Sequence, residues 1–222
     1  SPAPAPEKDP SVDIYACDIS SSIAVDAFLA ELGEKPVDIL VNNAGVAYLG
    51  LFEKMEPADL ETLIGVNLTG AMRMTRALLP KLLESRRAFI ANVNSMAGLI
   101  AAPGLCAYSA SKFGMIGFSQ ALARELKGRV GVCLVCPTFV TTNIANNALL
   151  ASKPAQGERA YRLSIMNAVL SIAGSKPQRT CRAIIRCVKE NRKLVLVNPD
   201  AHLLYYLDSF LPSISNFLIA KV

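Results

Sequence analysis

The sequence is poor in indole and imidazole side chains: its 222 residues include no tryptophan and a single histidine, His202. A histidine-based triad or zinc site needs more such groups, so we expect neither, and no metal. The formal net charge is +5, yet the lysines and arginines are scattered along the chain and the six tyrosines do not interleave with any basic run. A nucleic-acid-binding surface is therefore disfavoured.

Long hydrophobic runs are also missing. No apolar segment reaches the roughly 18 residues that a membrane-spanning helix needs, and the chain does not open with a basic segment followed by an apolar one. The composition is nevertheless 52% hydrophobic, which is enough for one well-buried domain at this length. We expect a single globular domain in the cytoplasm.

Six cysteines are present, and two of them, Cys133 and Cys136, form a CxxC pattern. Such a pattern can be a redox pair or half of a metal site. Here it lies within RVGVCLVCP, which is typical of a buried strand, where residues three apart point to opposite faces. We therefore expect all six cysteines to be reduced core or surface residues.

The chain divides into a short arm and one domain. Residues 1–11 alternate proline with alanine before turning charged, which is typical of a linker or an extended arm. From residue 12 to residue 222, short apolar runs alternate with amphipathic stretches. They predict strands at residues 12–17, 37–41, 88–93, 130–136 and 194–197, and helices at residues 20–33, 57–84, 107–127 and 177–192. This order is typical of an α/β fold with a parallel sheet covered on both faces.

Two regions fit this alternation less well. Residues 138–175 form a largely polar loop with a helical segment near residues 161–170. The tail, residues 200–222, is predicted to be helical, is broken at Pro212, and has more apolar residues than a helix in water needs. It docks on the domain, pairs with a second subunit or lies on a membrane surface, and docking is the favoured interpretation.

Polar residues follow the predicted strands where each strand ends. In a parallel sheet these carboxyl ends meet at one edge, where ligands bind. Tyr108 and Lys112 stand four residues apart in a predicted helix and therefore share a face. Taken singly, each of these residues has a simpler role as a turn, a cap or a solvated helix face. Their joint occurrence predicts a site made of Asp18, residues 42–45, Asn67, Asn94, Ser95, Tyr108, Lys112 and residues 137–142.

These residues give the chain its resemblance to the short-chain dehydrogenase/reductase family. The spacings agree with that family: Asn42 to Asn67 is 25 residues, Ser95 to Tyr108 is 13, and Tyr108 to Lys112 is 4. The matching motifs, in order, are NNAG at residues 42–45, VNLTG with Asn67, NSMAG with Ser95, YSASK at residues 108–112, and CPTFVTT with Pro137, Val140 and Thr142. The resemblance implies a three-layer Rossmann-like fold in which residues 138–175 include the substrate loop.

The resemblance also implies a catalytic role for four residues. Tyr108 would exchange a proton with the substrate oxygen while hydride passes to or from a nicotinamide. A free phenol titrates near pH 10, so we expect Lys112 to lower the pKa of Tyr108. Ser95 would hold the substrate oxygen, and Asn67 would bind a water that links Lys112 to solvent.

The implied cofactor is NADP or NAD, and the sequence does not choose between them. By the same resemblance, Asp18 would meet the adenine, while Asn42, Ala44 and Gly45 would line the adenosine. Tyr108 and Lys112 would contact the nicotinamide ribose. The carboxamide would be held by Pro137, Val140 and Thr142, although members of the family often have glycine where this chain has Thr138.

One motif of the family is missing from the sequence. The family begins with a strand, a glycine-rich TGxxxGxG turn and a helix, and no such motif is present here. The predicted fold is therefore N-terminally truncated, and the predicted strand at residues 37–41 becomes an apolar sheet edge unless something covers it. The chain is a fragment, which we favour, or a natural truncated form, or a protein whose sheet a partner completes.

Two functions remain as hypotheses. The first is an NAD(P)-dependent oxidoreductase that interconverts an alcohol and a ketone or aldehyde, with a lipophilic substrate because the residues around Ser95 and after Thr142 are mostly apolar. The second is a pseudoenzyme or interaction module that cannot bind a dinucleotide alone. The resemblance further implies a homo-oligomer formed through the helices at residues 57–84 and 107–127.

Overall fold

The computed structural model describes residues 11–138, 140, 149–150 and 175–213. Within these residues, four parallel strands form the main sheet in the order β1-β3-β4-β6. A second, two-stranded parallel sheet pairs β2 (Tyr48–Leu49) with β5 (Leu149–Leu150). The bounds of the main strands are β1 Ile39–Asn42, β3 Phe89–Val93, β4 Gly131–Cys136 and β6 Leu194–Leu196.

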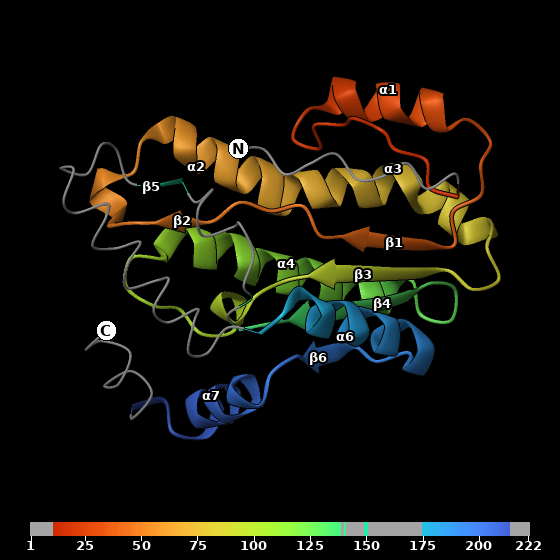
Figure 1. Cartoon of the computed structure of the whole chain (residues 1–222). Helices are drawn as coiled ribbons and strands as arrows, with labels where there is room; N and C mark the ends of the chain where they lie inside the picture. Colours follow the sequence, from red (N-terminus) through yellow and green to blue (C-terminus); the bar gives the residue numbers. More distant parts are fainter. Residues whose placement is uncertain (1–10, 139, 141–148, 151–174, 214–222) are drawn as a thin grey trace.

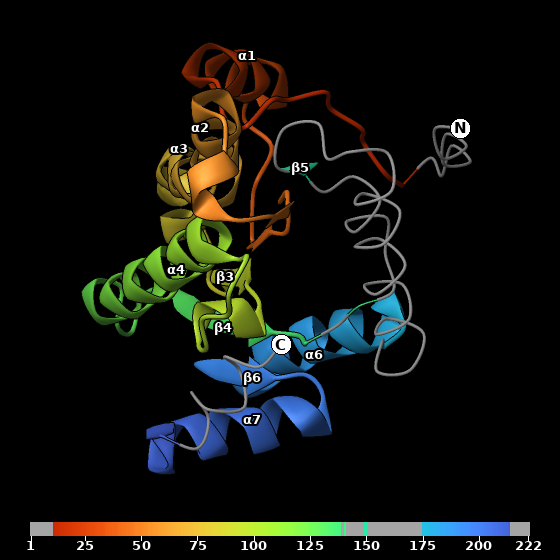
Figure 2. The same cartoon turned by 90° about the vertical axis from the view of Figure 1, so that its left-hand side faces the viewer.

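Helices cover both faces of the main sheet, as Figures 1 and 2 show. On one face lie α1 (Ser22–Leu32), α2 (Pro57–Ile64), α3 (Ala71–Glu84) and α4 (Cys106–Glu125). The other face is covered by α6 (Pro177–Glu190), and α7 (Pro199–Phe210) lies beyond the edge strand β6. The predicted α/β fold with a parallel sheet between helical layers is confirmed.

The alternation of side chains along β3 and β4 divides the core into two parts. Ile90 and Val132 face α3 and α4, where they pack with Leu78, Leu82 and Leu122. Their neighbours in the strands face the opposite way, and Phe89, Ala91, Cys133 and Val135 pack with Ala183 and Cys187 of α6. A sheet buried on both sides explains why these strands read as continuous apolar runs in the sequence.

The predicted helices form with two differences. Ser21 caps α1 by accepting a hydrogen bond from Ala24 N at 3.3 Å, and Gly128 turns the chain after α4 with a φ of 80°. The single helix expected at residues 57–84 is instead interrupted by a π turn at Gly65–Gly70. Two glycines weaken the α-helix there, and the Thr69 hydroxyl bonds the Gly65 carbonyl at 3.2 Å. Short 3-10 turns also form at Phe52–Lys54 and Met96–Gly98.

The strand expected at residues 12–17 does not form. No strand of the described part of the chain lies beyond β1, so this segment has no ladder to join. It packs along α1 instead, where Lys35 Nζ donates to Tyr15 Oη at 2.8 Å and the Tyr15 ring meets Phe28 edge-on at 5.4 Å. Ile14 remains 66% exposed.

The edge position expected for the strand at residues 37–41 is found in β1. Ile39 and Val41 are 47% and 41% exposed, on the same face of the sheet as their register partners Phe89 and Ala91. Those partners pack with α6 in a core cluster that includes neither Ile39 nor Val41.

The cysteines contradict the expectation that all six are reduced. Cys133 of β4 and Cys187 of α6 form a disulfide, with Cα atoms 6.5 Å apart, and both are fully buried. The CxxC partner, Cys136, stays a free buried thiol on the opposite face of the strand. The pairing could not be read from spacing because the bonded cysteines are 54 residues apart.

Other expectations fall outside the described residues. These are the arm up to residue 10, the helical segment at residues 161–170, and the tail after residue 213. Within the described ranges, no helix combines the length and hydropathy needed to cross a bilayer. The same ranges contain no group of three or more potential metal ligands.

Candidate active site

Predicted site residues from four separate elements meet at the carboxyl end of the main sheet. Ser95 follows β3, Tyr108 and Lys112 lie in the first two turns of α4, and Asn67 lies in the π turn between α2 and α3. Gly45, after β1, closes the group, because a Cβ atom on it would lie 3.3 Å from Asn67 Oδ1 and 3.8 Å from Lys112 Nζ. Convergence of this kind is what a catalytic site requires.

The Tyr108 phenol lies close enough to the Ser95 side chain for Ser95 to lower its pKa. Ser95 also caps the 3-10 turn that follows it, since its Oγ accepts from Ala97 N at 3.2 Å. Burial raises the pKa of Tyr108, while Ser95 acts in the opposite direction. The phenol therefore keeps its proton at neutral pH, which suits a proton donor.

Lys112 is buried, and its Nζ lies 5.7 Å from the centroid of the Tyr108 ring. Its Nζ donates to Val93 O at 3.4 Å, and burial lowers the pKa of Lys112 to about 8. The expectation that Lys112 lowers the pKa of Tyr108 is wrong for this structure, in which the phenol pKa is raised. The ammonium lies over the ring, and the loss of water around the phenol has the larger effect.

Asn67 is almost fully buried and clamps the loop after β1. Its Oδ1 accepts from Val46 N at 2.8 Å and its Nδ2 donates to Val46 O at 2.9 Å. The same Nδ2 lies 3.2 Å from Ser111 Oγ. Because the side-chain amide is committed to protein partners, the predicted water would have to be held by the backbone of Asn67.

Asn42 also points into the protein. Its Nδ2 donates to Asn92 Oδ1 at 2.8 Å and lies 3.0 Å from Thr75 Oγ1. Asn92 continues the chain of bonds by donating to Ser119 Oγ at 2.7 Å. This polar network joins β1 and β3 to α3 and α4 beneath the site, and it commits the Asn42 amide nitrogen to protein partners.

Two residues predicted for the adenosine end lie at the surface. Asp18 Oδ1 accepts from the backbone N and the hydroxyl of Ser20 at 2.9 and 2.7 Å, and these bonds lower the pKa of Asp18. The turn is held against α3, because Arg73 Nη1 donates to Ile19 O at 2.7 Å. Ala44 is exposed in the loop after β1.

The residues predicted for the carboxamide are only partly described. Pro137 is buried at the end of β4, and its carbonyl accepts from Met96 N at 2.9 Å, directly after Ser95. Val140 forms an isolated bridge with Ser175. Thr142 lies outside the described residues.

Three further residues support the site; Asn94 was predicted to lie there, whereas Ser111 and Gly98 were given no role from the sequence. Ser111 is fully buried and donates to Tyr108 O at 2.7 Å, so it links Asn67 to the first turn of α4. Asn94 Nδ2 donates to Lys112 O at 3.2 Å. Gly98 packs against both Asn94 and the Lys112 carbonyl. For Ser111 and Asn94, the sequence signal for such a supporting role is a polar residue among mainly apolar neighbours. Gly98 gives no comparable signal.

We expect Gly98→Ala to lower the free energy of unfolding by about 2 kcal/mol. The added Cβ would lie 2.7 Å from Asn94 Nδ2 and 2.8 Å from the Lys112 carbonyl, and neither position can yield without moving β3 and α4 apart. Urea unfolding measures the effect. Gly117→Ala in α4 is the matched control, since nothing lies within 4 Å of its new Cβ and alanine favours a helix. Equal stability of the two variants would show that the close approach at Gly98 is not rigid.

Comparison with known proteins gives consistent matches. The family model described as short chain dehydrogenase matches residues 4–152. D-threitol dehydrogenase of Mycolicibacterium smegmatis is 39% identical over 139 residues, which are 60% of this chain and 53% of that protein. The 3-oxoacyl-[acyl-carrier-protein] reductase FabG of Thermotoga maritima is 34% identical over 134 residues, 59% of this chain and 54% of that protein. The chain thus matches about half the length of these relatives.

A solved structure matches more of the chain. The crystal structure of a short chain dehydrogenase/reductase from Burkholderia phymatum in complex with NAD superposes with a TM-score of 0.78 and 25% identity. The match covers 89% of this chain and 75% of that one. The sequence match and the structural match therefore both point to short-chain dehydrogenases.

Proposed function

Because the chain belongs to the short-chain dehydrogenase family, we propose that it interconverts an alcohol and a ketone or aldehyde with NAD(P) as the hydride carrier. The observation that carries this proposal is the gathering of Ser95, Tyr108 and Lys112 from β3 and α4 at the carboxyl end of the sheet. Folding alone does not require a hydroxyl, a phenol and a buried amine in contact, so their combination favours chemistry over packing.

In the alcohol-forming direction, Tyr108 would donate its proton to the substrate oxygen while Ser95 holds that oxygen by hydrogen bond. The raised pKa of Tyr108 keeps this proton in place until the reaction. Lys112, whose pKa is lowered to about 8, would then reprotonate the phenol. A lysine that titrates close to neutral pH can pass a proton on in either direction.

The dinucleotide would supply or accept the hydride. The residues at hand suit its two ends: Lys112, Pro137 and Val140 would hold the nicotinamide side, and the turn at Asp18 with Ala44 and Gly45 would border the adenosine. A side chain at Gly45 would crowd the site, because its Cβ would lie 3.3 Å from Asn67 Oδ1 and 3.8 Å from Lys112 Nζ. No residue is assigned to the pyrophosphate, because the sequence has no TGxxxGxG motif.

For the substrate we propose a lipophilic alcohol or carbonyl compound. Leu99 and Ile100, which follow Ser95, are partly exposed near the site. The two relatives act, by their names, on a polyol and on an acyl-carrier-protein-linked ketoacyl group, so both polar and lipophilic substrates occur among similar proteins. A rate with fatty aldehydes or ketoacyl thioesters that exceeds the rate with sugars supports the lipophilic class, and the reverse order excludes it.

We further propose a homo-oligomer. The helices expected to form its interface expose large apolar side chains, among them Met72 of α3 and Phe113 of α4, which are 37% and 44% exposed. Such residues on neighbouring helices are typical of a surface that another subunit covers.

Titration of the purified chain with NADH and NADPH, followed by nucleotide fluorescence, tests the cofactor. We expect saturable binding of one nucleotide, in the micromolar to millimolar range that is usual for enzyme cofactors and substrates. A hydride-transfer assay with the lipophilic panel follows. Binding without transfer, or no binding of either nucleotide, would favour the second candidate function.

The second candidate is a non-catalytic interaction module. It is favoured by β1, which has a strand on one side only among the described residues and whose Ile39 and Val41 are partly exposed, as is expected for an edge that another polypeptide could cover. The intact set of Asn67, Ser95, Tyr108 and Lys112 argues against it, because such a module would not need all four.

A further inference from the structure

The outer face of α6 carries a row of cations. Arg179, Arg182, Arg186 and Lys189 follow one another at spacings of three and four residues, so they lie on one side of the helix, and all are exposed. Its other side packs Ala183 and Cys187 against the sheet. The apolar side of this basic helix is therefore already used by the fold, and its cationic side faces solvent.

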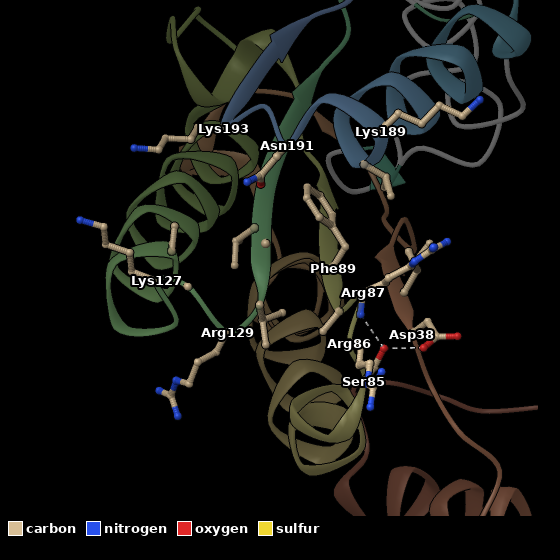
Figure 3. A pocket seen from close by; sticks show the side chains of 18 residues that line it. Asp38, Ser85, Arg86, Arg87, Phe89, Lys127, Arg129, Lys189, Asn191 and Lys193 are labelled. Carbon is tan, nitrogen blue, oxygen red and sulfur yellow. Dashed lines mark hydrogen bonds between the residues drawn. The ribbon is translucent and has the colours of Figure 1, made fainter.

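The row continues into a cleft of about 1000 Å³ at the amino ends of the strands, opposite to the candidate active site. Lys189 belongs to both the helix row and the cleft. Figure 3 shows the labelled basic side chains spread around the rim and directed toward solvent rather than toward one central point. The rim cations are Arg86, Arg87, Lys127, Arg129, Lys189 and Lys193.

These charges have few partners within the protein. Asp38 is the one carboxylate among the residues that line the cleft, and it is bonded to the Ser85 hydroxyl. Glu190, beside the rim, pairs with Arg186 and Arg192. Across the described residues, no carboxylate pairs with any of the rim cations.

Helix dipoles do not account for the rim. A cation in the last turn of a helix is stabilised by the helix C-terminus, and α3, α4 and α6 already have Lys81, Arg124 and Lys189 there. The rim cations of the three following turns stand beyond the helix ends. Arg129 alone among them bonds a helix carbonyl, donating to Glu125 O at 3.2 Å.

We propose that this cationic face, made of the α6 row and the cleft rim, binds an anionic phospholipid surface. A broad, mainly cationic surface that is open to solvent, and on which only Arg186 pairs with a carboxylate among the described residues, suits a broad surface of opposite sign. Clusters of four to eight basic residues are the usual means by which proteins bind anionic lipid headgroups. The proposal does not depend on the dehydrogenase activity.

Apolar side chains beside the cations favour lipid over a nucleic acid or an acidic protein. Ile185 stands among the arginines of α6 and is 53% exposed. On the far side of β6, which contacts both helices, α7 exposes Leu203, Tyr206 and Phe210, at 71%, 53% and 75%. An aliphatic group such as Ile185 among the cations suits the boundary between headgroups and acyl chains. The cationic face itself has no exposed aromatic residue on which bases could stack.

Co-sedimentation of the full chain with vesicles tests the proposal. We expect binding to vesicles of phosphatidylcholine with phosphatidylglycerol, no binding to phosphatidylcholine alone, and a steep loss as NaCl rises from about 50 to about 300 mM. The triple variant Arg179→Gln, Arg182→Gln, Lys189→Gln should bind anionic vesicles about 100-fold more weakly. All three residues are exposed and unpaired in the described structure, and circular dichroism checks that the variant is folded.

The matched control changes the net charge equally on the α1 and α3 side of the molecule. Lys35→Gln, Lys54→Gln, Arg76→Gln should keep vesicle binding within about twofold of the wild type, because distant exposed charges are screened. Equal losses in the two triple variants would overturn the proposal, as would no binding to anionic vesicles. Tighter binding to a DNA duplex or to polyglutamate than to vesicles at the same salt would also overturn it.

Discussion

Tyr108→Phe is expected to lower kcat/KM for hydride transfer by about 1000-fold, within the range that general acid–base catalysis contributes. The substitution removes the single oxygen that reaches the Ser95 side chain and leaves the ring in place over Lys112. Because the side chain keeps its packing against the core cluster of Tyr48, Leu63 and Ala107, the melting temperature should stay within a few degrees of the wild type. The measurements are nicotinamide absorbance for the rate and calorimetry for stability.

The control removes a phenol oxygen elsewhere. Tyr206 lies on the exposed side of α7, 53% accessible, and stacks on Phe210. Tyr206→Phe should therefore leave the rate unchanged. If the wild type transfers hydride and Tyr108→Phe does so at the same rate, the proton-donor role is wrong, although the family fold stands. If the wild type transfers no hydride, the proposed oxidoreductase function of this chain is wrong, whatever the rate of the variant.

Reduction of the disulfide between Cys133 and Cys187 is expected to lower the free energy of unfolding by about 4 kcal/mol. The bond joins β4 to α6 across a separation of 54 residues, and closing a loop of that size restricts the unfolded chain by about this amount. Both sulfurs are fully buried, so the reductant acts through the unfolded state. Urea unfolding with and without a phosphine reductant measures the difference.

Two controls accompany this measurement. Cys106→Ser changes an exposed free thiol and should leave the difference between oxidised and reduced protein unchanged. Peptide mapping without reductant should recover the Cys133 and Cys187 peptides linked. Six reactive thiols in the denatured, unreduced protein would contradict the bond, and the reductant should then have no effect on stability.

The sequence predicted the sheet well because both of its faces are buried. Continuous apolar runs with turn residues at their ends locate β1, β3, β4 and β6 to within two residues. It failed at residues 12–17, where the local pattern is as apolar as in the true strands. A strand exists only when another strand supplies its hydrogen bonds, and no local pattern reports whether that neighbour is present.

The candidate site divides in the same way. Motif spacing brought Asn67, Ser95, Tyr108 and Lys112 together correctly in space, since it fixes which strand end or helix turn each one occupies. It did not reveal that Asn42 is turned inward, because the direction of an amide depends on partners that lie far along the chain. It also gave the wrong direction for the pKa of Tyr108, because spacing carries no information about burial.

The basic residues show a further property that the sequence did not predict, namely which side chains gather on one surface. Along the chain they are spread over three turns and one helix, and their scatter disfavoured a nucleic-acid-binding surface. The fold brings Arg87, Lys127 and Lys193 to one end of the sheet, because all three turns lead from a helix into a parallel strand. In such a sheet, helix-to-strand turns gather at one edge however far apart they lie in sequence.

The two bonds between Asn67 and Val46 allow the side chain to act as a substitute peptide group. A carboxamide has the same donor and acceptor as a backbone amide, so it pairs with Val46 as a neighbouring strand would. The loop that follows the edge strand β1 is therefore held by a side chain from the π turn between α2 and α3. Its position close to Lys112 does not require a further strand next to β1, and only asparagine has both the length and the two polar atoms to hold it there.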